Sequence, residues 1–420
     1  MYHISRLENG LTVATAEMPH MASVSVGLWV GVGSRYEPAE LNGVCHFIEH
    51  LLFKGTARRT ARRISQDVEG LGGYLNAFTS EEMTCYHCRA PHQHFDDLLD
   101  VLTDMFLHSR FAPEEIDKER GVIKEEIAMY RDQPHHLVQE LLNESLWPNH
   151  PLGRNLAGTE QTLDYLDRAR LVEYQRRNYA AGRTLIVVAG RIRHPRVLRA
   201  VKRLAGRFPA GAGPAFAPVT EVQAAPRIHL HTKATEQTQL ALGIRTTSRH
   251  DPRRFPLRLL NVLLGENASS RLFNVIREER GIAYSIDTAL GFFDDTGTLT
   301  ISAGLDLDHL RETLELVRAE LRRFTLAAPP VREFQRARDY ALGQVDLGLE
   351  SADNQMNWLG EQLLGYGRVA TARQAKRRLA AVTRAEVLAA ARDFFRPERL
   401  TLALVSPLKS TRGLAPLLQI

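Results

Sequence analysis

Residues 178–190 are Asn-Tyr-Ala-Ala-Gly-Arg-Thr-Leu-Ile-Val-Val-Ala-Gly, and residues 394–406 are Phe-Phe-Arg-Pro-Glu-Arg-Leu-Thr-Leu-Ala-Leu-Val-Ser. Each stretch is typical of a helix end, a turn and then a buried strand. Two more pairs of segments recur in the same order at an offset of about 215 residues: strand-like 83–89 with 298–304, and apolar helical stripes after His94 and His309. Because three pairs share one offset, the sequence predicts a duplication.

The stretch between these halves is poor in side chains that can form a core. Nine of the ten residues 209–218 are Pro, Ala or Gly, which is typical of a linker. We therefore predict an N-terminal domain over residues 1–208, a linker over 209–226 and a related domain over 227–420.

Both halves mix strand and helix patterns. The first half has predicted strands at 11–17, 23–31, 83–89 and 184–190, and predicted helices at 39–53, 61–71, 93–108, 113–131 and 167–177. These strands are too numerous for simple β-α-β alternation. The prediction is an α+β fold of two related halves, each an antiparallel or mixed sheet packed with helices.

Composition and charge exclude several classes of protein. The 420 residues are 44% hydrophobic and 25% charged, which excludes a mostly disordered chain. The net charge of +5 is spread along the chain, and its densest run, Arg58, Arg59, Arg62 and Arg63, has helical spacing. A solvated helix face is favoured over a nucleic-acid patch. The sequence shows no signal peptide and no transmembrane run, so we expect a cytoplasmic protein with no membrane or nucleic-acid partner.

The three cysteines predict no disulfide framework. Cys85 and Cys88 have the spacing of a redox or zinc pair, but they lie in a strand-like stretch. Residues three apart on a strand face opposite sides of the sheet, which argues against a joint role.

The strongest chemical signal is the stretch Gly-Val-Cys-His-Phe-Ile-Glu-His-Leu-Leu-Phe-Lys-Gly-Thr at residues 43–56. It contains His46-x-x-Glu49-His50, the inverse of the commoner H-E-x-x-H order. On a helix, residues i and i+4 share a face, so His46 and His50 can present two imidazoles to one zinc ion. Glu49 can then lie beside the metal as a general base that takes a proton from the attacking water.

A catalytic zinc site usually has a third protein ligand. The acidic helix predicted from residue 113 places Glu119 and Glu126 on one face, two turns apart. Glu126 can bind zinc while Glu119 supports the site. The spacing does not exclude five histidines as rival ligands: His87, His92, His94, His135 and His136.

These motifs resemble the pitrilysin/insulinase family of zinc peptidases, and most closely its short branch with the mitochondrial processing peptidases and their bacterial relatives. The resemblance implies that the third ligand lies 76 residues after the second histidine, which is Glu126 here, with a supporting acid seven residues earlier, Glu119. It also implies that the edge strand around Asn76, Ala77 and Phe78 pairs with the substrate backbone.

The second half lacks this metal set, because Asn261, Leu264 and Gly265 align with His46, Glu49 and His50. It does carry Arg277 and Tyr284, seven residues apart, and the resemblance implies that these two contact the substrate near the scissile bond. From the residues alone, Arg277 is a surface helix residue and Tyr284 a half-buried packing residue.

Together the motifs and the resemblance predict a zinc metalloendopeptidase with one Zn²⁺ per chain. The resemblance implies that it cleaves short or unfolded peptides inside a closed chamber between the two halves. The alternatives are a non-catalytic or partner-dependent subunit of a heteromeric peptidase and a structural zinc protein. The resemblance implies a dimer, because the short branch of the family has only two such halves per chain, whereas the long branch has four. A homodimer is favoured over pairing with a related subunit, because one chain has both the metal set and the Arg277/Tyr284 pair.

Overall fold

The structure is a computed structural model that describes residues 2–220 and 223–420. Residues 221 and 222 of the predicted linker lie outside the described residues. The chain forms two compact units. Unit 1 consists of Met1–Ala128, Arg154–Ala217 and Gly348–Ala370, and unit 2 consists of Met129–Gly153, Pro218–Leu347 and Thr371–Ile420.

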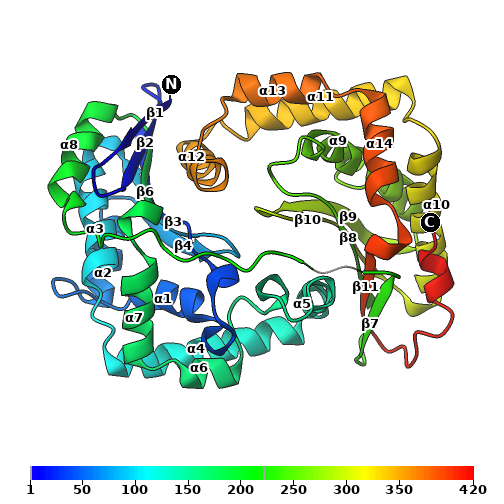
Figure 1. The fold of residues 1–420 in the computed structure, drawn as a ribbon, viewed down its shortest axis with the longest axis horizontal. Helices are drawn as coiled ribbons and strands as arrows, with labels where there is room; N and C mark the ends of the chain where they lie inside the picture. The colour runs from blue at the N-terminus through cyan, green and yellow to red at the C-terminus, as the bar shows by residue number, and fades with distance from the viewer. Residues whose placement is uncertain (1, 221–222) are drawn as a thin grey trace. The chain divides into compact units, whose positions relative to one another are not determined.

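Each unit is built on one sheet (Figure 1). The sheet of unit 1 has the order β1-β2-β6-β3-β5-β4, with β1 (Tyr2–Arg6), β2 (Thr12–Glu17), β3 (Ser23–Val30), β4 (Tyr74–Thr79), β5 (Thr84–Pro91) and β6 (Thr184–Gly190). The sheet of unit 2 has the order β7-β11-β8-β10-β9, with β7 (Arg227–Thr232), β8 (Thr238–Arg245), β9 (Ala283–Phe292), β10 (Gly297–Leu305) and β11 (Leu400–Ser406).

The two sheets share one topology. Strands β2-β6-β3-β5-β4 correspond in order to β7-β11-β8-β10-β9. In each sheet the first of these pairs is parallel and the other pairs are antiparallel. The predicted α+β class with two related halves and mixed sheets is therefore confirmed.

Helices complete both units. Unit 1 contains α1 (Val44–Leu52), α2 (Ala61–Glu69), α3 (Phe95–His108), most of α4 (Pro113–Asp132), α6 (Glu160–Tyr165), α7 (Arg168–Asn178), α8 (His194–Ala205) and α12 (Ala352–Tyr366). Unit 2 contains α5 (Pro134–Leu146), α9 (Arg254–Leu264), α10 (Leu310–Leu326), α11 (Val331–Leu347), α13 (Ala372–Ala380) and α14 (Arg384–Phe394).

Alternation along the strands gives each sheet two apolar faces. In β3, Val26 and Leu28 pack with α1 and α3, whereas Trp29 packs on the other face with Met356 of α12. The Trp29 indole Nε1 donates to the Met356 sulfur at 3.2 Å. Side chains of successive strand residues point to opposite faces, so a strand buried on both sides is apolar along its whole length.

Helices α5 and α12 each pack in a different unit from the segments that precede and follow them in the sequence. Helix α12 covers one face of the unit 1 sheet, and α5 covers a face of the unit 2 sheet through contacts with β7, β8 and β11. Helix α5 precedes the predicted linker 209–226 but belongs to unit 2, and α12 follows this linker but belongs to unit 1. The compact units therefore differ from the predicted domains by these two helices. The roles assigned to the two sequence segments stay predictions.

The predicted helix 39–53 is wrong at its beginning. The structure has a short 3₁₀ helix, Ala39–Leu41, and α1 starts only at Val44. Gly43 separates them with a φ of 93°, a left-handed conformation that a helix interior does not contain. Helix α1 therefore begins after Gly43 and is not continuous with the 3₁₀ helix.

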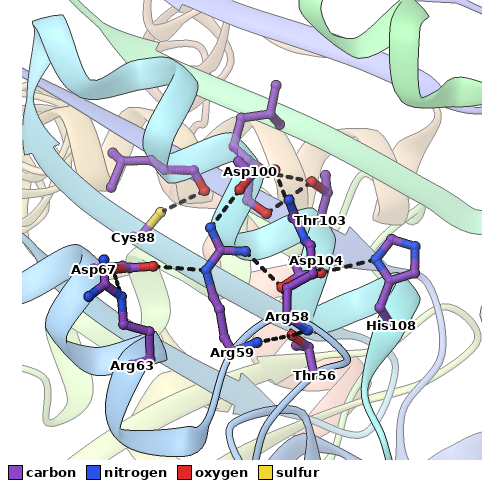
Figure 2. Close-up of polar contacts among 12 residues, drawn as sticks. Thr56, Arg58, Arg59, Arg63, Asp67, Cys88, Asp100, Thr103, Asp104 and His108 are labelled. Carbon is purple, nitrogen blue, oxygen red and sulfur yellow. Dashed lines mark hydrogen bonds and ion pairs between the residues drawn. The ribbon is translucent and has the colours of Figure 1, made fainter.

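The predicted solvated helix face is wrong for Arg59, whose side chain is only 13% exposed, whereas Arg58 is exposed but lies outside the helix (Figure 2). Arg58 and Arg59 precede α2 and bind carboxylates of α3: Arg58 Nε lies 3.0 Å from Asp104, and Arg59 lies 2.7 Å from Asp104 and 2.6 Å from Asp100. Arg63 on α2 is exposed, as predicted. The arginines tie the loop after α1 to α3, which the spacing of the basic residues did not reveal.

The predicted strand around the cysteines is confirmed as β5. Cys85 packs with Trp29 on the α12 face and Cys88 packs on the opposite face, and both are free thiols. Among the described residues, no helix has the length and apolar character needed to cross a membrane.

Candidate metal centre

Helix α1 carries both histidines of the motif. Phe47, Ile48 and Leu51 are buried in the unit 1 core and fix the rotation of the helix. His46 and His50 are one turn apart on the remaining face, with ring centroids 4.6 Å apart. The helix therefore presents two imidazoles to one point.

Helix α4 brings a carboxylate to the same point. Glu126 Oε2 lies 3.8 Å from His46 Nε2 and 3.6 Å from His50 Nε2. One ligand atom from each of the three residues lies within 4.8 Å of the other two. Among the described residues this is the one such group of three His, Cys, Asp or Glu side chains.

This donor set fits zinc. Ligand atoms about 2.0 Å from a tetrahedral zinc ion lie roughly 3.3 Å apart, slightly closer than the 3.8 and 3.6 Å that separate Glu126 from the two histidines. Two imidazoles and one carboxylate form a known three-ligand set for catalytic zinc, which leaves a fourth position open.

Glu119 holds His50 in the orientation that such a site needs. Its Oε2 lies 3.1 Å from His50 Nδ1, and its Oε1 lies 2.8 Å from Lys54 Nζ. Burial by itself raises the pKa of Glu119, but the hydrogen bonds from His50 and Lys54 outweigh burial and lower that pKa. An ionised Glu119 accepts a hydrogen bond from Nδ1–H of His50, which leaves the Nε2 lone pair on the side of Glu126.

His46 is neutral at physiological pH. Burial, reinforced by the nearby charge of His50, lowers the pKa of His46 to about 4. A neutral imidazole keeps a lone pair for a metal ion, so no proton has to be displaced there.

Glu49 lies on α1 beside this group but outside it. Its Oε2 accepts a hydrogen bond from Thr79 Oγ1 of β4 at 2.5 Å. Burial raises the pKa of Glu49, although the Thr79 hydrogen bond and the charge of His50 act in the opposite direction. A raised pKa favours uptake of a proton by the carboxylate, which suits a general base.

A buried acid that sequence reasoning missed fixes the beginning of α1. Glu37 accepts hydrogen bonds from the backbone N–H groups of Gly43 at 2.7 Å and Cys45 at 2.9 Å, and from Asn42 Nδ2 at 3.0 Å. Burial raises its pKa against the effect of these bonds. A local capping motif does not reveal these hydrogen bonds, because Glu37 lies seven residues before the first residue of α1.

The rival histidines lie in other surroundings. His87 lies on β5 near Tyr74 and Phe78, His92 contacts a backbone carbonyl, and His94 pairs with Asp97. His135 and His136 lie on α5 in unit 2, with their rings 4.3 Å apart. None of the five belongs to the group of three donors.

The predicted substrate strand lies at the edge of its sheet. Strand β4 pairs with β5 on one side and ends the strand order, so its other side has no strand partner among the residues that the structure describes. Asn76 is exposed, and its Oδ1 accepts the Ala77 N–H at 2.8 Å. Phe78 packs against Trp29 on the α12 face.

Arg277 and Tyr284 lie together in unit 2. Arg277 is in a π-helical turn, Phe273–Glu278, and its guanidinium lies 5.5 Å from the centroid of the Tyr284 ring. Tyr284, on β9, is 78% exposed, so the interpretation of it as a packing residue is wrong. A tyrosine exposed to this degree is available to a ligand.

The fold and this geometry define a class: an α+β protein of two related units with an inverted His-x-x-Glu-His metal centre in the first. Comparison with known proteins agrees. Residues 12–160 match the family described as Insulinase (Peptidase family M16), and residues 165–340 match Peptidase M16 inactive domain. The chain belongs to the insulinase family of peptidases, family M16, as its motifs predict.

Its relatives bear the names of zinc proteases. The uncharacterized zinc protease YmxG of Bacillus subtilis is 37% identical over 407 residues, which are 95% of this chain and 97% of the relative. An uncharacterized zinc protease of Streptomyces coelicolor is 36% identical over 97% of this chain and 90% of its own length. A third, from Rickettsia bellii, is 32% identical over 97% and 98%.

Two solved structures share the fold. A protease from Helicobacter pylori superimposes with a TM-score of 0.91 at 19% identity, over 97% of this chain and 99% of the other. A peptidase M16 inactive domain from Pseudomonas fluorescens gives a TM-score of 0.90, also at 19% identity, over 97% and 99%.

Proposed function

We propose that the chain is a zinc-dependent endopeptidase that uses Glu49 as its general base. The observation that carries the proposal is the arrangement of three converging donors, His46, His50 and Glu126, with the half-buried acid Glu49 beside them and outside the donor group. A structural zinc site has no use for such an acid and usually closes its fourth position with protein.

His46, His50 and Glu126 would hold one Zn²⁺ per chain, and the ion supplies a Lewis acid for the scissile carbonyl and the attacking water. Glu49 accepts the proton of that water and delivers it to the leaving amine. Thr79 holds the Glu49 carboxylate in place, and Glu119 keeps His50 in the tautomer that exposes Nε2.

The same proposal assigns roles to residues of both units. An extended peptide adds to the free side of β4 around Asn76, Ala77 and Phe78, through backbone hydrogen bonds. The Asn76 side chain has to release the Ala77 N–H for this pairing. Tyr284 donates to the developing oxyanion and Arg277 orients the substrate, as the family resemblance implies.

We extend the proposal to the substrate and the assembly. The family resemblance supports short or unfolded peptides as substrates, cleaved in a closed chamber. It also supports a homodimer, or a pair with a related subunit, and we propose that this assembly acts in the cytoplasm.

The second candidate function is a non-catalytic or partner-dependent subunit. The match of residues 165–340 to a domain described as inactive is compatible with it. The complete set of donors and the general base in one chain favour catalysis, because a subunit without activity has no need to keep them.

The test is metal-dependent hydrolysis by the purified chain alone. The chain is stripped with a chelator, about one equivalent of zinc is returned, and cleavage of a mixed peptide library is followed by mass spectrometry. We expect cleavage to disappear and to return with zinc. Stoichiometric zinc binding without cleavage would favour the partner-dependent subunit.

A further inference from the structure

A second charged site lies in unit 1, where β6 leads into α8. A cavity of about 730 Å³ opens there, and four arginines line it, Arg191, Arg193, Arg196 and Arg199. Its one acidic residue is Glu17. The lining thus carries a net charge of +3, from four guanidinium groups and one carboxylate.

Three of these guanidinium groups have no acid partner. Arg196 Nη2 donates to Asp96 at 2.8 Å. Over residues 2–220 and 223–420, the side chains of Arg191, Arg193 and Arg199 form no ion pair or hydrogen bond. The Glu17 carboxylate is already engaged, because its Oε1 accepts the backbone N–H of His194 at 2.9 Å.

Helix packing concentrates this charge on one surface. Val197, Ala200 and Val201 of α8 are buried in the unit 1 core, so the basic residues of the helix face outward. Residues 191–207 contain six arginines, one lysine and no acid. All four arginines of the cavity are exposed at the end where α8 begins.

Like charges around one cavity repel each other, and a bound anion relieves that repulsion. The planar guanidinium group matches phosphate oxygens with two parallel N–H donors. The cavity volume falls within the range of roughly 300–1,000 Å³ typical of small-ligand sites, and Pro19, Ile192 and Pro195 give it an apolar wall.

We propose that this cavity binds a small anion that bears a phosphoryl group, with Arg191, Arg193 and Arg199 as its ligands. The apolar wall takes the organic part of the molecule. No aromatic side chain lines the cavity, and base stacking, a usual feature of single-stranded nucleic-acid sites, therefore has no platform here. The binding is separate from peptide hydrolysis.

The experiment titrates the zinc-loaded full chain with inorganic pyrophosphate by isothermal calorimetry. One variant combines Arg193→Ala and Arg199→Ala in the cavity. A matched variant combines Arg203→Ala on α8 and Arg207→Ala just after it, which removes the same charge outside the cavity. We expect saturable binding to the parent chain, at least about tenfold weaker binding to the cavity variant and a change below about twofold in the matched variant.

Two further arms complete the test. Arg199→Lys keeps the charge but loses the paired donors, so it should weaken binding even where thermal unfolding shows an intact fold. Vesicles of phosphatidylcholine with and without phosphatidylglycerol separate a lipid headgroup from a soluble phosphate compound. Absence of both pyrophosphate and vesicle binding would overturn the proposal, and so would equal losses in the two double variants, because these indicate a diffuse surface charge.

Discussion

His50 is the residue on which the contacts of the candidate centre converge. Its Nδ1 lies 3.1 Å from Glu119, while its Nε2 lies 3.6 Å from Glu126. Lys54, four residues further on, binds the second oxygen of Glu119 at 2.8 Å. Glu119 and Lys54, which are not metal ligands themselves, thus set the tautomer of the ligand His50.

The zinc affinity should depend most on Glu126, the single anionic donor. We expect Glu126→Gln to weaken zinc binding by more than about 100-fold, because loss of an outer-shell partner alone costs 10–100-fold in comparable sites. Competition with a chromophoric chelator measures the affinity. Glu125→Gln, an exposed neighbour, is the matched control and should leave it unchanged. Full zinc retention in Glu126→Gln would place the third ligand elsewhere.

Glu37 should contribute to stability through the beginning of α1. Glu37→Ala leaves the N–H groups of Gly43 and Cys45 buried without an acceptor, at a cost of about 2–4 kcal/mol. Glu37→Gln keeps one acceptor oxygen and should cost less. Urea unfolding of the two variants measures the difference. Equal stability of Glu37→Ala and the parent chain would show that the cap is dispensable.

Residues of the site differ in how far the sequence reveals them. His46 and His50 are predictable because one helical turn joins them, whatever surrounds the helix. The roles of Glu37, Thr79 and Lys54 are not predictable from the sequence. Each side chain contacts a residue to which no local sequence pattern connects it. Glu126 lies between these cases: its helix is predictable, but its distance from His50 follows only from tertiary packing.

At the scale of elements, the loop after α1 is held by the arginine–aspartate cluster of Figure 2. Asp104 of α3 is fully buried and accepts hydrogen bonds from Thr56 at 2.7 Å, Arg59 at 2.7 Å and Arg58 at 3.0 Å. Burial alone raises the pKa of Asp104, but these bonds outweigh it and lower the pKa from 3.8 to about 2.

This lowered pKa predicts a pH-dependent contribution to stability. Because the pKa of Asp104 is lower in the folded than in the unfolded chain, its contribution is complete above pH 4 and is lost as the pH falls towards 2. Asp104→Asn should therefore destabilise the protein by about 2 kcal/mol at pH 7 and by less at pH 3. Urea unfolding at both values checks this.

Asp100→Asn is the control, because Asp100 is 44% exposed and a pair at the surface contributes little. A loss for Asp104→Asn that is the same at pH 3 and pH 7 would assign the effect to packing rather than to charge.

At the scale of the whole chain, the duplication is visible in the sequence and the exchange of helices is not. The repeat offset predicts two sheets of one design, and the strand orders agree with it. An apolar helix face indicates that a helix packs on something apolar, but amphipathicity does not say which of the two sheets α5 or α12 covers. The structure answers this question: Met356 of α12 packs with Trp29 of the unit 1 sheet, and Leu142 of α5 packs with Ala241 of the unit 2 sheet.

Tyr284 tests whether unit 2 contributes to the chemistry. We expect Tyr284→Phe to lower kcat about 10- to 1000-fold, the loss typical of one oxyanion donor, with the zinc content unchanged. The phenol matters where charge develops, so peptide affinity should change less than kcat. Tyr165→Phe, at another exposed tyrosine, is the control. A change in affinity alone would make Tyr284 a binding residue.

The central claim is that Glu49 is the general base of a zinc peptidase, and the turnover of Glu49→Gln tests it most directly. Gln has nearly the same shape as Glu but is not basic. At equal zinc content, we predict that Glu49→Gln binds peptide and cleaves it at least about 100-fold more slowly than the parent chain. Turnover near that of the parent chain would contradict the account.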